Sequence, residues 1–229
     1  MDSPLTTKVA FMVGPVPVTE PVVVTWGLIG LLTLAALFAR SRLSLLPSRR
    51  QAALELIVTA MQNLIRDTMR AAPEPYLPLI GTIFTFVLLA NWSSLVPGIE
   101  PPTASLETDA ALALIVFVAV IYFGIRARGL GAYLKTFAEP TFVMVPLNIV
   151  ETFTRTLSLI VRLFGNVMSG VFVVGIVLSL AGLLVPIPLM ALELLTGAVQ
   201  AYIFTVLAMV FIGGAVGEAR ADGKEGEPS

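Results

Sequence analysis

The sequence predicts an all-α, multi-pass membrane protein. Of its 229 residues, 57% are hydrophobic and 13% are charged, and the mean hydropathy is +0.93. Soluble domains carry about 25% charged residues, so the low charge content indicates a protein embedded in lipid. Its apolar residues gather into about five runs long enough to cross a bilayer as helices of about 20 residues. We therefore expect residues 1–229 to form a single membrane domain with about five membrane segments and one interfacial helix.

The first apolar run, Pro21–Ala39, follows an N-terminal segment, residues 1–20, that includes Asp2 and Glu20. A secretory signal would begin with basic residues and end in a small-residue cleavage site, and this segment has neither. We therefore expect the run to remain as the first membrane span.

Residues 49–70 have a different pattern, with apolar side chains on one helical face and polar side chains on the other. Such a helix typically lies along the membrane interface, here on the cytoplasmic side, although packing on a soluble partner is the alternative. The apolar face comprises Leu54, Ile57, Val58, Met61, Leu64, Ile65 and Met69, and the polar face Glu55, Thr59, Gln62, Asn63, Arg66 and Asp67.

Four further apolar runs follow the interfacial helix. The last two are longer than a bilayer requires, so we expect them to be strongly tilted, kinked or re-entrant. Pro186 and Pro188 mark a turn between them, which predicts a hairpin of two long helices over residues 141–216. The four runs are Leu79–Val96, Ala110–Ile125, Thr141–Leu184 and Leu189–Val216.

Loop charges predict the orientation of the chain. Basic residues follow the first and third spans, whereas the connection between the second and third spans is acidic. The positive-inside rule places the basic connections in the cytoplasm, and the N-terminal segment then lies outside. The polar tail, residues 218–229, lies in the cytoplasm and is expected to be disordered. The basic residues are Arg40, Arg42, Arg49, Arg50, Arg126, Arg128 and Lys135, and the acidic ones are Glu100, Glu107 and Asp109.

Composition also excludes several kinds of function. The sequence has no cysteine and no histidine, which removes disulfides, thiol chemistry and the commonest metal ligand. Its net charge of −1 and the lack of a basic patch give no reason to expect nucleic acid as a partner. We expect no metal and no cofactor.

Arg162 is the most informative residue, because it stands within one of the long apolar runs. Between Thr141 and Gly217 the only other charged residues are Glu151, Arg155 and Glu193. A guanidinium does not lose its proton in proteins, and moving one to the bilayer centre costs from about 2.5 to over 10 kcal/mol. Because folding does not require this cost, we interpret Arg162 as a functional charge.

Polar residues around Arg162 share one helical face, within a sector of about 80° at 100° per residue. On the next helix Glu193 shares a face with Thr196 and Gln200. Hydrogen bonds that hold the two helices together are the alternative role, but they contribute only about 0.6 kcal/mol each. That is too little to explain Arg162. The face comprises Asn148, Glu151, Arg155, Ser158, Arg162, Asn166 and Ser169.

The other charged residues each allow two interpretations. Glu193 is a candidate ion-path residue, because ionisable groups at membrane depth often mark such paths, but it could instead pair with an arginine. Glu151 and Arg155 are four residues apart, a spacing that also suits a simple pair along one helix. Asn91 is either a helix cap or a path residue.

An ion path needs a route to half-depth from each side and a barrier between the two routes. A fixed positive charge repels a passing cation and favours the charged form of a carboxylate that has released its ion. The sequence has no second intramembrane carboxylate placed to serve Arg162 in this way. We therefore expect the carboxylate to come from another subunit.

Several motifs occur in a specific order. The segment Ser-Leu-Ile-Val-Arg-Leu-Phe-Gly-Asn at 158–166 precedes Gln-Ala-Tyr-Ile-Phe at 200–204, and Pro-Leu-Asn ends at Asn148. Upstream, Pro-Leu-Ile-Gly-Thr-Ile-Phe at 78–84 leads to Asn91, and Thr108 and Asp109 open a helix. With these motifs, residues 45–216 resemble subunit a of the membrane (Fo) sector of F-type ATP synthases.

The resemblance implies a non-catalytic subunit with two offset ion half-channels against a rotating ring of c subunits. It also implies subunit b of the stator stalk and the F1 sector as partners, in a bacterial plasma membrane. Arg162 matches the essential arginine of the family, Asn166 the asparagine four residues later, and Gln200 the glutamine of the last helix. The transported ion, proton or sodium, is left open.

Two residues depart from the family pattern. Many relatives carry an ionisable residue where this chain has Val171, and those without it often place a carboxylate on the last helix, where Glu193 stands. Many also have a proline where this chain has Thr156. The competing interpretations are a self-contained secondary ion transporter, against which the lack of a duplicated half argues, and a structural scaffold.

Overall fold

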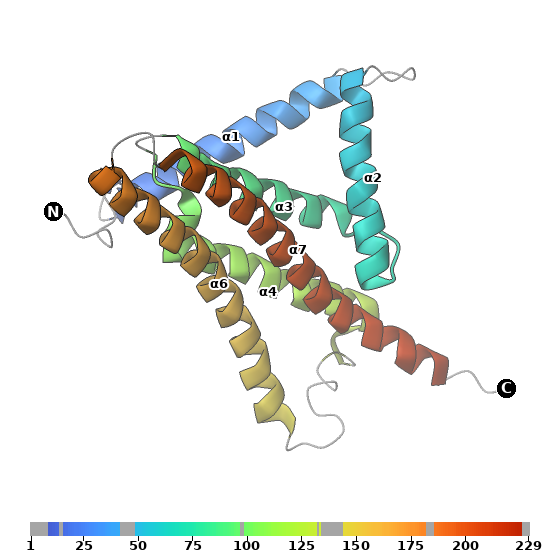
Figure 1. Ribbon diagram of the computed structural model, residues 1–229. Helices are drawn as coiled ribbons and strands as arrows, with labels where there is room; N and C mark the ends of the chain where they lie inside the picture. Colours follow the sequence, from blue (N-terminus) through green and yellow to red (C-terminus); the bar gives the residue numbers. More distant parts are fainter. Residues whose placement is uncertain are drawn as a thin grey trace.

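The computed structural model describes residues 9–13, 16–41, 49–96, 99–131, 133, 144–181 and 186–225. A short antiparallel hairpin, β1 (Val9–Val13) and β2 (Val16–Thr19), precedes a set of α-helices (Figure 1). The α-helices are α1 (Glu20–Ser41), α2 (Arg49–Met69), α3 (Leu77–Trp92), α4 (Leu106–Arg128), α6 (Met144–Ala181) and α7 (Pro186–Glu225). Two 3-10 turns, η1 (Ser93–Leu95) and η2 (Pro102–Ala104), join α3 to α4.

Five of these helices, α1, α3, α4, α6 and α7, are long and apolar enough to cross a membrane. This finding confirms the predicted membrane segments, and α2 covers the amphipathic stretch that was predicted between the first two. At 1.5 Å per residue, α6 and α7 are about 57 and 60 Å long, roughly twice the hydrocarbon thickness of a bilayer. The predicted tilt follows from this excess length.

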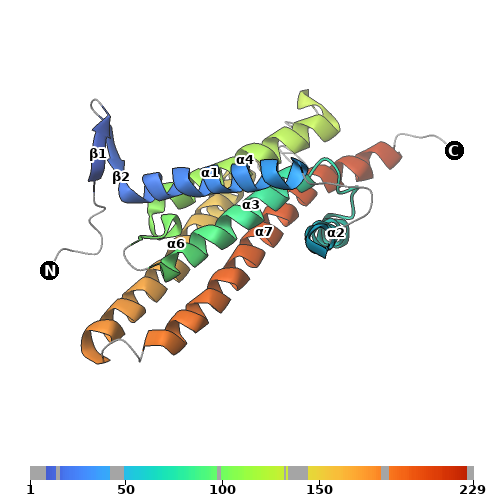
Figure 2. The same ribbon diagram turned by 90° about the horizontal axis from the view of Figure 1, so that it is seen from above.

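Helix α7 is the central element of the fold, since it contacts α2, α3, α4 and α6 (Figures 1 and 2). Small residues allow these close approaches: Ala201 and Ala208 are completely buried, and a Cβ added at Gly197 would lie 3.0 Å from the Cβ of Asn91. The larger buried side chains of α7 are Phe204, Met209 and Ile212.

Helix α1 lies at the edge of this core, where Leu28 and Leu32 pack against it, and it contacts mainly α3 and η2. No residue of its most apolar window is buried, which suits a helix with one side open to lipid. Helix α2 is divided along its length. Near its end Ile65 and Met69 are buried against the core, whereas Leu54 and Ile57 near its beginning are exposed.

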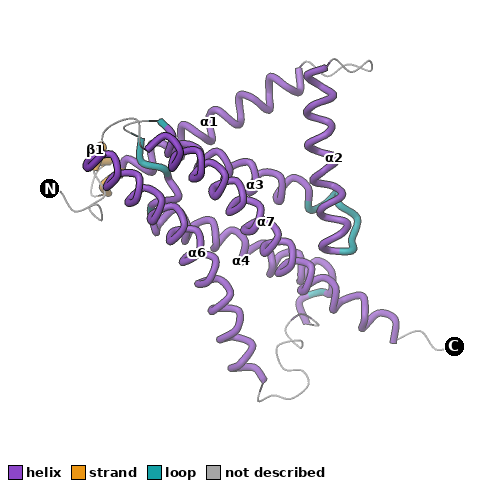
Figure 3. Tube along the Cα trace, viewed as in Figure 1, coloured by secondary structure: helices purple, strands orange, loops and turns teal. Residues whose placement is uncertain are grey.

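Three features differ from the sequence-based expectation (Figure 3). The β-hairpin was not predicted, because two strands of four or five residues carry too short an alternating pattern. Helix α7 continues through much of the polar tail to Glu225, where disorder was expected, because a helix already formed adds each residue at little cost. Helix α4 begins at Leu106, before the helix opening predicted at Thr108 and Asp109 and before the apolar run that starts at Ala110.

Candidate functional site

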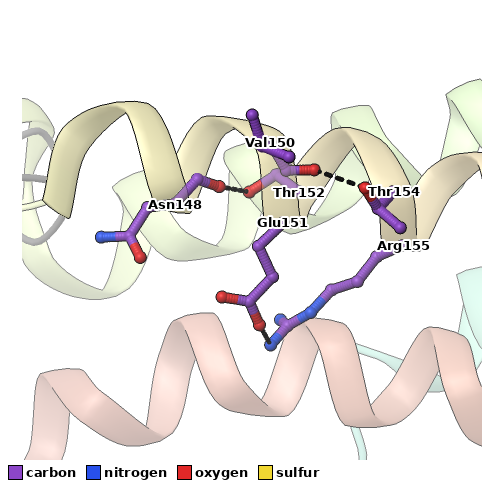
Figure 4. A network of polar contacts seen from close by, with 6 residues as sticks. All are labelled: Asn148, Val150, Glu151, Thr152, Thr154 and Arg155. Carbon is purple, nitrogen blue, oxygen red and sulfur yellow. Dashed lines mark hydrogen bonds and ion pairs between the residues drawn. The ribbon is translucent and has the colours of Figure 1, made fainter.

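The polar face predicted around Arg162 lies on α6, and its first part is turned toward α7 (Figure 4). Glu151 and Arg155 form an ion pair, and each side chain is about half exposed, at 52% and 51%. The Arg155 guanidinium also lies 5.5 Å from the ring centroid of Phe211 on α7, a cation–π contact. Arg155 therefore pairs with Glu151 along α6 and also contacts Phe211 on α7.

A groove of about 590 Å³ opens between α6 and α7 beside this pair. Arg162 lines it two helical turns beyond Arg155, with Ser158 between them. The groove is lined by Leu147, Val150, Glu151, Thr154, Arg155, Ser158, Leu159, Arg162, Leu207 and Phe211. Polar groups thus follow the groove toward Arg162 between otherwise apolar walls.

Arg162 itself is exposed on α6 and makes no hydrogen bond or ion pair with any residue that the structure describes. The exposed apolar side chains Val161 and Leu157 lie on the adjoining face of α6, about 100° and 140° around the helix from Arg162. A guanidinium at membrane depth beside such a face requires a partner or water to offset the cost of its burial. The chain therefore presents an unpaired cation on a face that another molecule can cover.

Glu193 lies on α7 directly against Gly170 of α6. A Cβ added at Gly170 would come within 2.9 Å of the Glu193 Oε1 atom, so a larger residue here would push the carboxylate out of its present position. The Ser94 side chain of η1 also lies beside the carboxylate. Glu193 on α7 is therefore held against α6 and beside η1 at the end of α3.

Asn91 connects the end of α3 to both η2 and α7. Its Nδ2 donates to the Gly197 carbonyl at 2.9 Å, and its Oδ1 accepts from the Thr103 hydroxyl at 2.8 Å. The neighbouring Trp92 donates from Nε1 to the Leu194 carbonyl at 3.1 Å. Asn91 is 5% exposed, so these bonds compensate its amide for lost contacts with water. Together with Glu193 and Ser94, these groups form what we call the α3–α7 polar cluster: Asn91, Ser94, Thr103 and Glu193.

Replacing Asn91 by alanine is expected to lower the stability of the helix bundle by about 1–3 kcal/mol, because the Gly197 carbonyl and Thr103 hydroxyl lose their partner. Thermal unfolding of the detergent-solubilised protein measures this loss. Thr82→Ala serves as the control, since Thr82 is exposed on the same helix and its hydroxyl donates to the Pro78 carbonyl within α3 at 2.6 Å. Equal melting temperatures for Asn91→Ala and wild type would contradict a structural role.

The remaining predicted site residues fall into the same two areas. Asn148 lies before Glu151 on α6, and Asn166 lies one turn beyond Arg162, partly buried. Gln200 is 6% exposed on α7, and its Nε2 has no hydrogen-bond partner within the described part of the chain. The helix remains regular at Thr156, whose hydroxyl donates to the Thr152 carbonyl at 3.0 Å.

The burial of one acidic residue was not predicted. Asp109 was counted with the charges between the second and third spans and placed at the opening of a helix; it lies in the first turn of α4 and is 0% exposed. The helix starts at Leu106 because the Ser105 side chain caps it, accepting from the Thr108 amide at 3.4 Å. The pattern Ser-x-x-Thr-Asp before an apolar run was the signal that could have located this start.

These features define a class of protein: a multi-pass helical membrane protein with charged groups between its two longest helices, as ion-conducting proteins have. Comparison with known sequences then identifies the family. The sequence model of the ATP synthase A chain family matches residues 22–213, so the chain belongs to that family. It is therefore a non-catalytic membrane subunit, subunit a, of ATP synthase.

Individual relatives agree with this assignment. ATP synthase subunit a 2 of Bradyrhizobium sp. (strain BTAi1) is 58% identical over 94% of this chain and 96% of the relative. ATP synthase subunit a of Albidiferax ferrireducens is 47% identical over 90% of both chains. ATP synthase subunit a 1 of Prosthecochloris aestuarii is 48% identical over 90% of this chain and 94% of the relative.

Proposed function

We propose that this subunit forms two offset ion half-channels against the c-ring, with Arg162 as the charge barrier between them. The observation that carries the proposal is the exposed Arg162 guanidinium of α6, which lines the groove between α6 and α7 and has no partner among the described residues. A membrane-embedded cation without a partner in its own chain fits a carboxylate supplied by a neighbouring subunit. The ring carboxylates of the c subunits are that partner.

The barrier works through charge. A cation that leaves one half-channel is repelled by the guanidinium and cannot cross directly to the other. A ring carboxylate that has released its ion is stabilised beside the same guanidinium, and it moves on when the ring turns. Ion flow is thereby coupled to rotation of the ring, and through the F1 sector to ATP synthesis or hydrolysis.

Two areas of polar groups supply the routes. The groove with Glu151 and Arg155 lies toward the N-terminal end of α6, which the positive-inside rule assigns to the cytoplasm. The α3–α7 polar cluster lies where α3 ends and α4 begins, beside the acidic connection assigned to the outside. We therefore assign Glu193 to the outer half-channel. Asn148 and Asn166 accompany the α6 charges, and Gln200 accompanies Glu193.

The assembly that this function requires includes the c-ring, subunit b of the stator stalk and the F1 sector. The N-terminus is assigned to the outside of a bacterial plasma membrane and the C-terminus to the cytoplasm. Purification separates this proposal from a self-contained ion transporter: the subunit should copurify with a ring and a soluble ATPase. Recovery of the chain alone as an active transporter would favour the second function.

The purified complex in sealed vesicles is expected to take up ions when ATP is added. Acidification that needs no sodium and that a protonophore abolishes would establish a proton path. Sodium uptake that persists with a protonophore would establish sodium paths, with carboxylate and amide oxygens as transient ligands. An intact, ATP-hydrolysing complex that moves neither ion would contradict the half-channel proposal.

A further inference from the structure

Three residues hold all the buried side-chain polar atoms that lack a hydrogen-bond partner in the described part of the chain. They are both carboxylate oxygens of Asp109, the Oε1 atom of Glu193 and the Nε2 atom of Gln200. Buried polar groups in proteins are almost always paired, because an unpaired one loses its interactions with water without compensation. Glu193 and Gln200 already belong to the proposed ion path. Asp109 does not, and it is the most deeply buried of the three.

The position of Asp109 in α4 directs it into the bundle. It lies three, four and seven residues before Leu112, Ala113 and Val116, which places all four on one helical face. Those three residues are buried in the hydrophobic core that α4 forms with α6 and α7. Glu107, only two residues earlier, is exposed. The same helical turn therefore carries one solvated carboxylate and one that is enclosed.

Hydroxyl and amide groups connect the surroundings of Asp109 with the α3–α7 polar cluster. The Ser105 and Thr108 hydroxyls, on the turn before Asp109, are 2.7 Å apart, and Ser105 bonds to the Pro102 carbonyl at 2.9 Å. Thr103, which follows Pro102, donates to Asn91 of that cluster. Polar groups thus continue from Glu193 past Asn91 and Thr103 to the turn that holds Asp109.

Packing does not account for a carboxylate at this place, because its neighbours on the face are apolar and Asp109 makes no hydrogen bond or ion pair with a described side chain. A buried carboxylate is tolerated only when it binds a proton, a cation or water. Carboxylate, hydroxyl and amide oxygens are also the groups that bind small hard cations.

We propose that Asp109 is a transfer carboxylate of the outer half-channel, binding the transported cation in transit between the outer surface and the c-ring. This inference rests on the proposed function of the subunit. Binding of a proton or sodium ion neutralises the carboxylate, and release of the ion restores the charge, so no other bond changes. Glu193 and Asp109 then provide two successive binding positions on the same side of the membrane.

The test compares Asp109→Asn and Asp109→Leu with wild type in the complete ATP synthase, reconstituted in sealed vesicles. Asparagine keeps the shape but removes the charge, and leucine removes every polar atom from the site. We expect the initial rate of ATP-driven ion uptake to fall by at least about tenfold in both variants, because the transfer step loses its ionisable group. Glu107→Gln, which removes the exposed carboxylate of the same turn, should retain the wild-type rate.

Uptake is measured both as acidification and as sodium accumulation, so the affected signal identifies the ion that Asp109 binds. Wild-type uptake in either variant would overturn the inference. If neither variant assembled, Asp109 would be assigned to folding, which would overturn it too. An Arg162→Ala complex measured in parallel separates the two proposals. Loss of coupling there, with normal uptake in Asp109→Asn, would leave the proposed function intact and reject only the role of Asp109.

Discussion

Arg162→Ala is expected to abolish ATP synthesis driven by an ion gradient while the subunit still inserts and assembles. The reason is physical: without the guanidinium, nothing repels a cation at the point between the half-channels, and nothing stabilises the emptied ring carboxylate. Removing Arg162 should not harm folding, because the side chain is exposed and makes no bond to a described residue. ATP synthesis by inverted vesicles under an imposed gradient measures the loss of function. The content of subunit a in the purified complex measures whether the variant still inserts and assembles.

Two control variants sharpen this measurement. Arg162→Lys keeps the charge but replaces the planar guanidinium by a compact, more strongly hydrated ammonium. At most a partial recovery of ATP synthesis relative to Arg162→Ala is expected. Arg126→Ala removes an exposed arginine whose described partner is the Tyr122 hydroxyl of its own helix, and it should leave synthesis unchanged. Synthesis near the wild-type rate in Arg162→Ala would refute the central role given to this residue.

Glu193→Gln is expected to slow ion conduction by about tenfold without uncoupling the enzyme, because a glutamine keeps the shape but cannot take up and release an ion. The carboxylate has a defined place, against Gly170 and beside Ser94. Passive ion flux through F1-depleted vesicles measures conduction, and the ratio of ions moved to ATP hydrolysed in intact vesicles measures coupling.

Glu193→Asp preserves the carboxyl group one methylene shorter and should retain a larger part of the flux than Glu193→Gln. Glu100→Gln, which changes an exposed acidic residue between α3 and α4, controls for a general effect of negative charge on the outer side. If Glu193→Gln conducted as fast as wild type, Glu193 would be reduced to a contact between α6 and α7.

Local sequence patterns were enough to predict most of the helices. Five apolar runs separated by charged or proline-containing connections were enough to predict the membrane helices, because in lipid the backbone must satisfy its own hydrogen bonds. The amphipathic helix α2 could also be predicted from its repeat of apolar residues. Its division into a packed half and an exposed half could not be predicted, because both halves have the same pattern and only contacts with α7 and α3 distinguish them.

Two candidate site residues could be predicted from the sequence because charge, like backbone hydrogen bonding, is constrained by lipid. Arg162 and Glu193 stand out because a charge in an apolar run is costly wherever the helix packs. The partners of Asn91 were not predictable. Its amide reaches Gly197, which is 106 residues away in the sequence, and no local rule connects these positions.

The sequence by itself determined the class of this protein, its five membrane helices and the family to which it belongs. The class and the membrane helices depend on composition and on short-range periodicity, and the family depends on motifs that match its members in order. Only the tertiary structure decided which polar groups meet: Glu193 with Gly170, Asn91 with Thr103 and α7, and Asp109 with the core rather than with water. The physical reason is that burial depends on what packs against a residue, and packing partners come from distant parts of the chain.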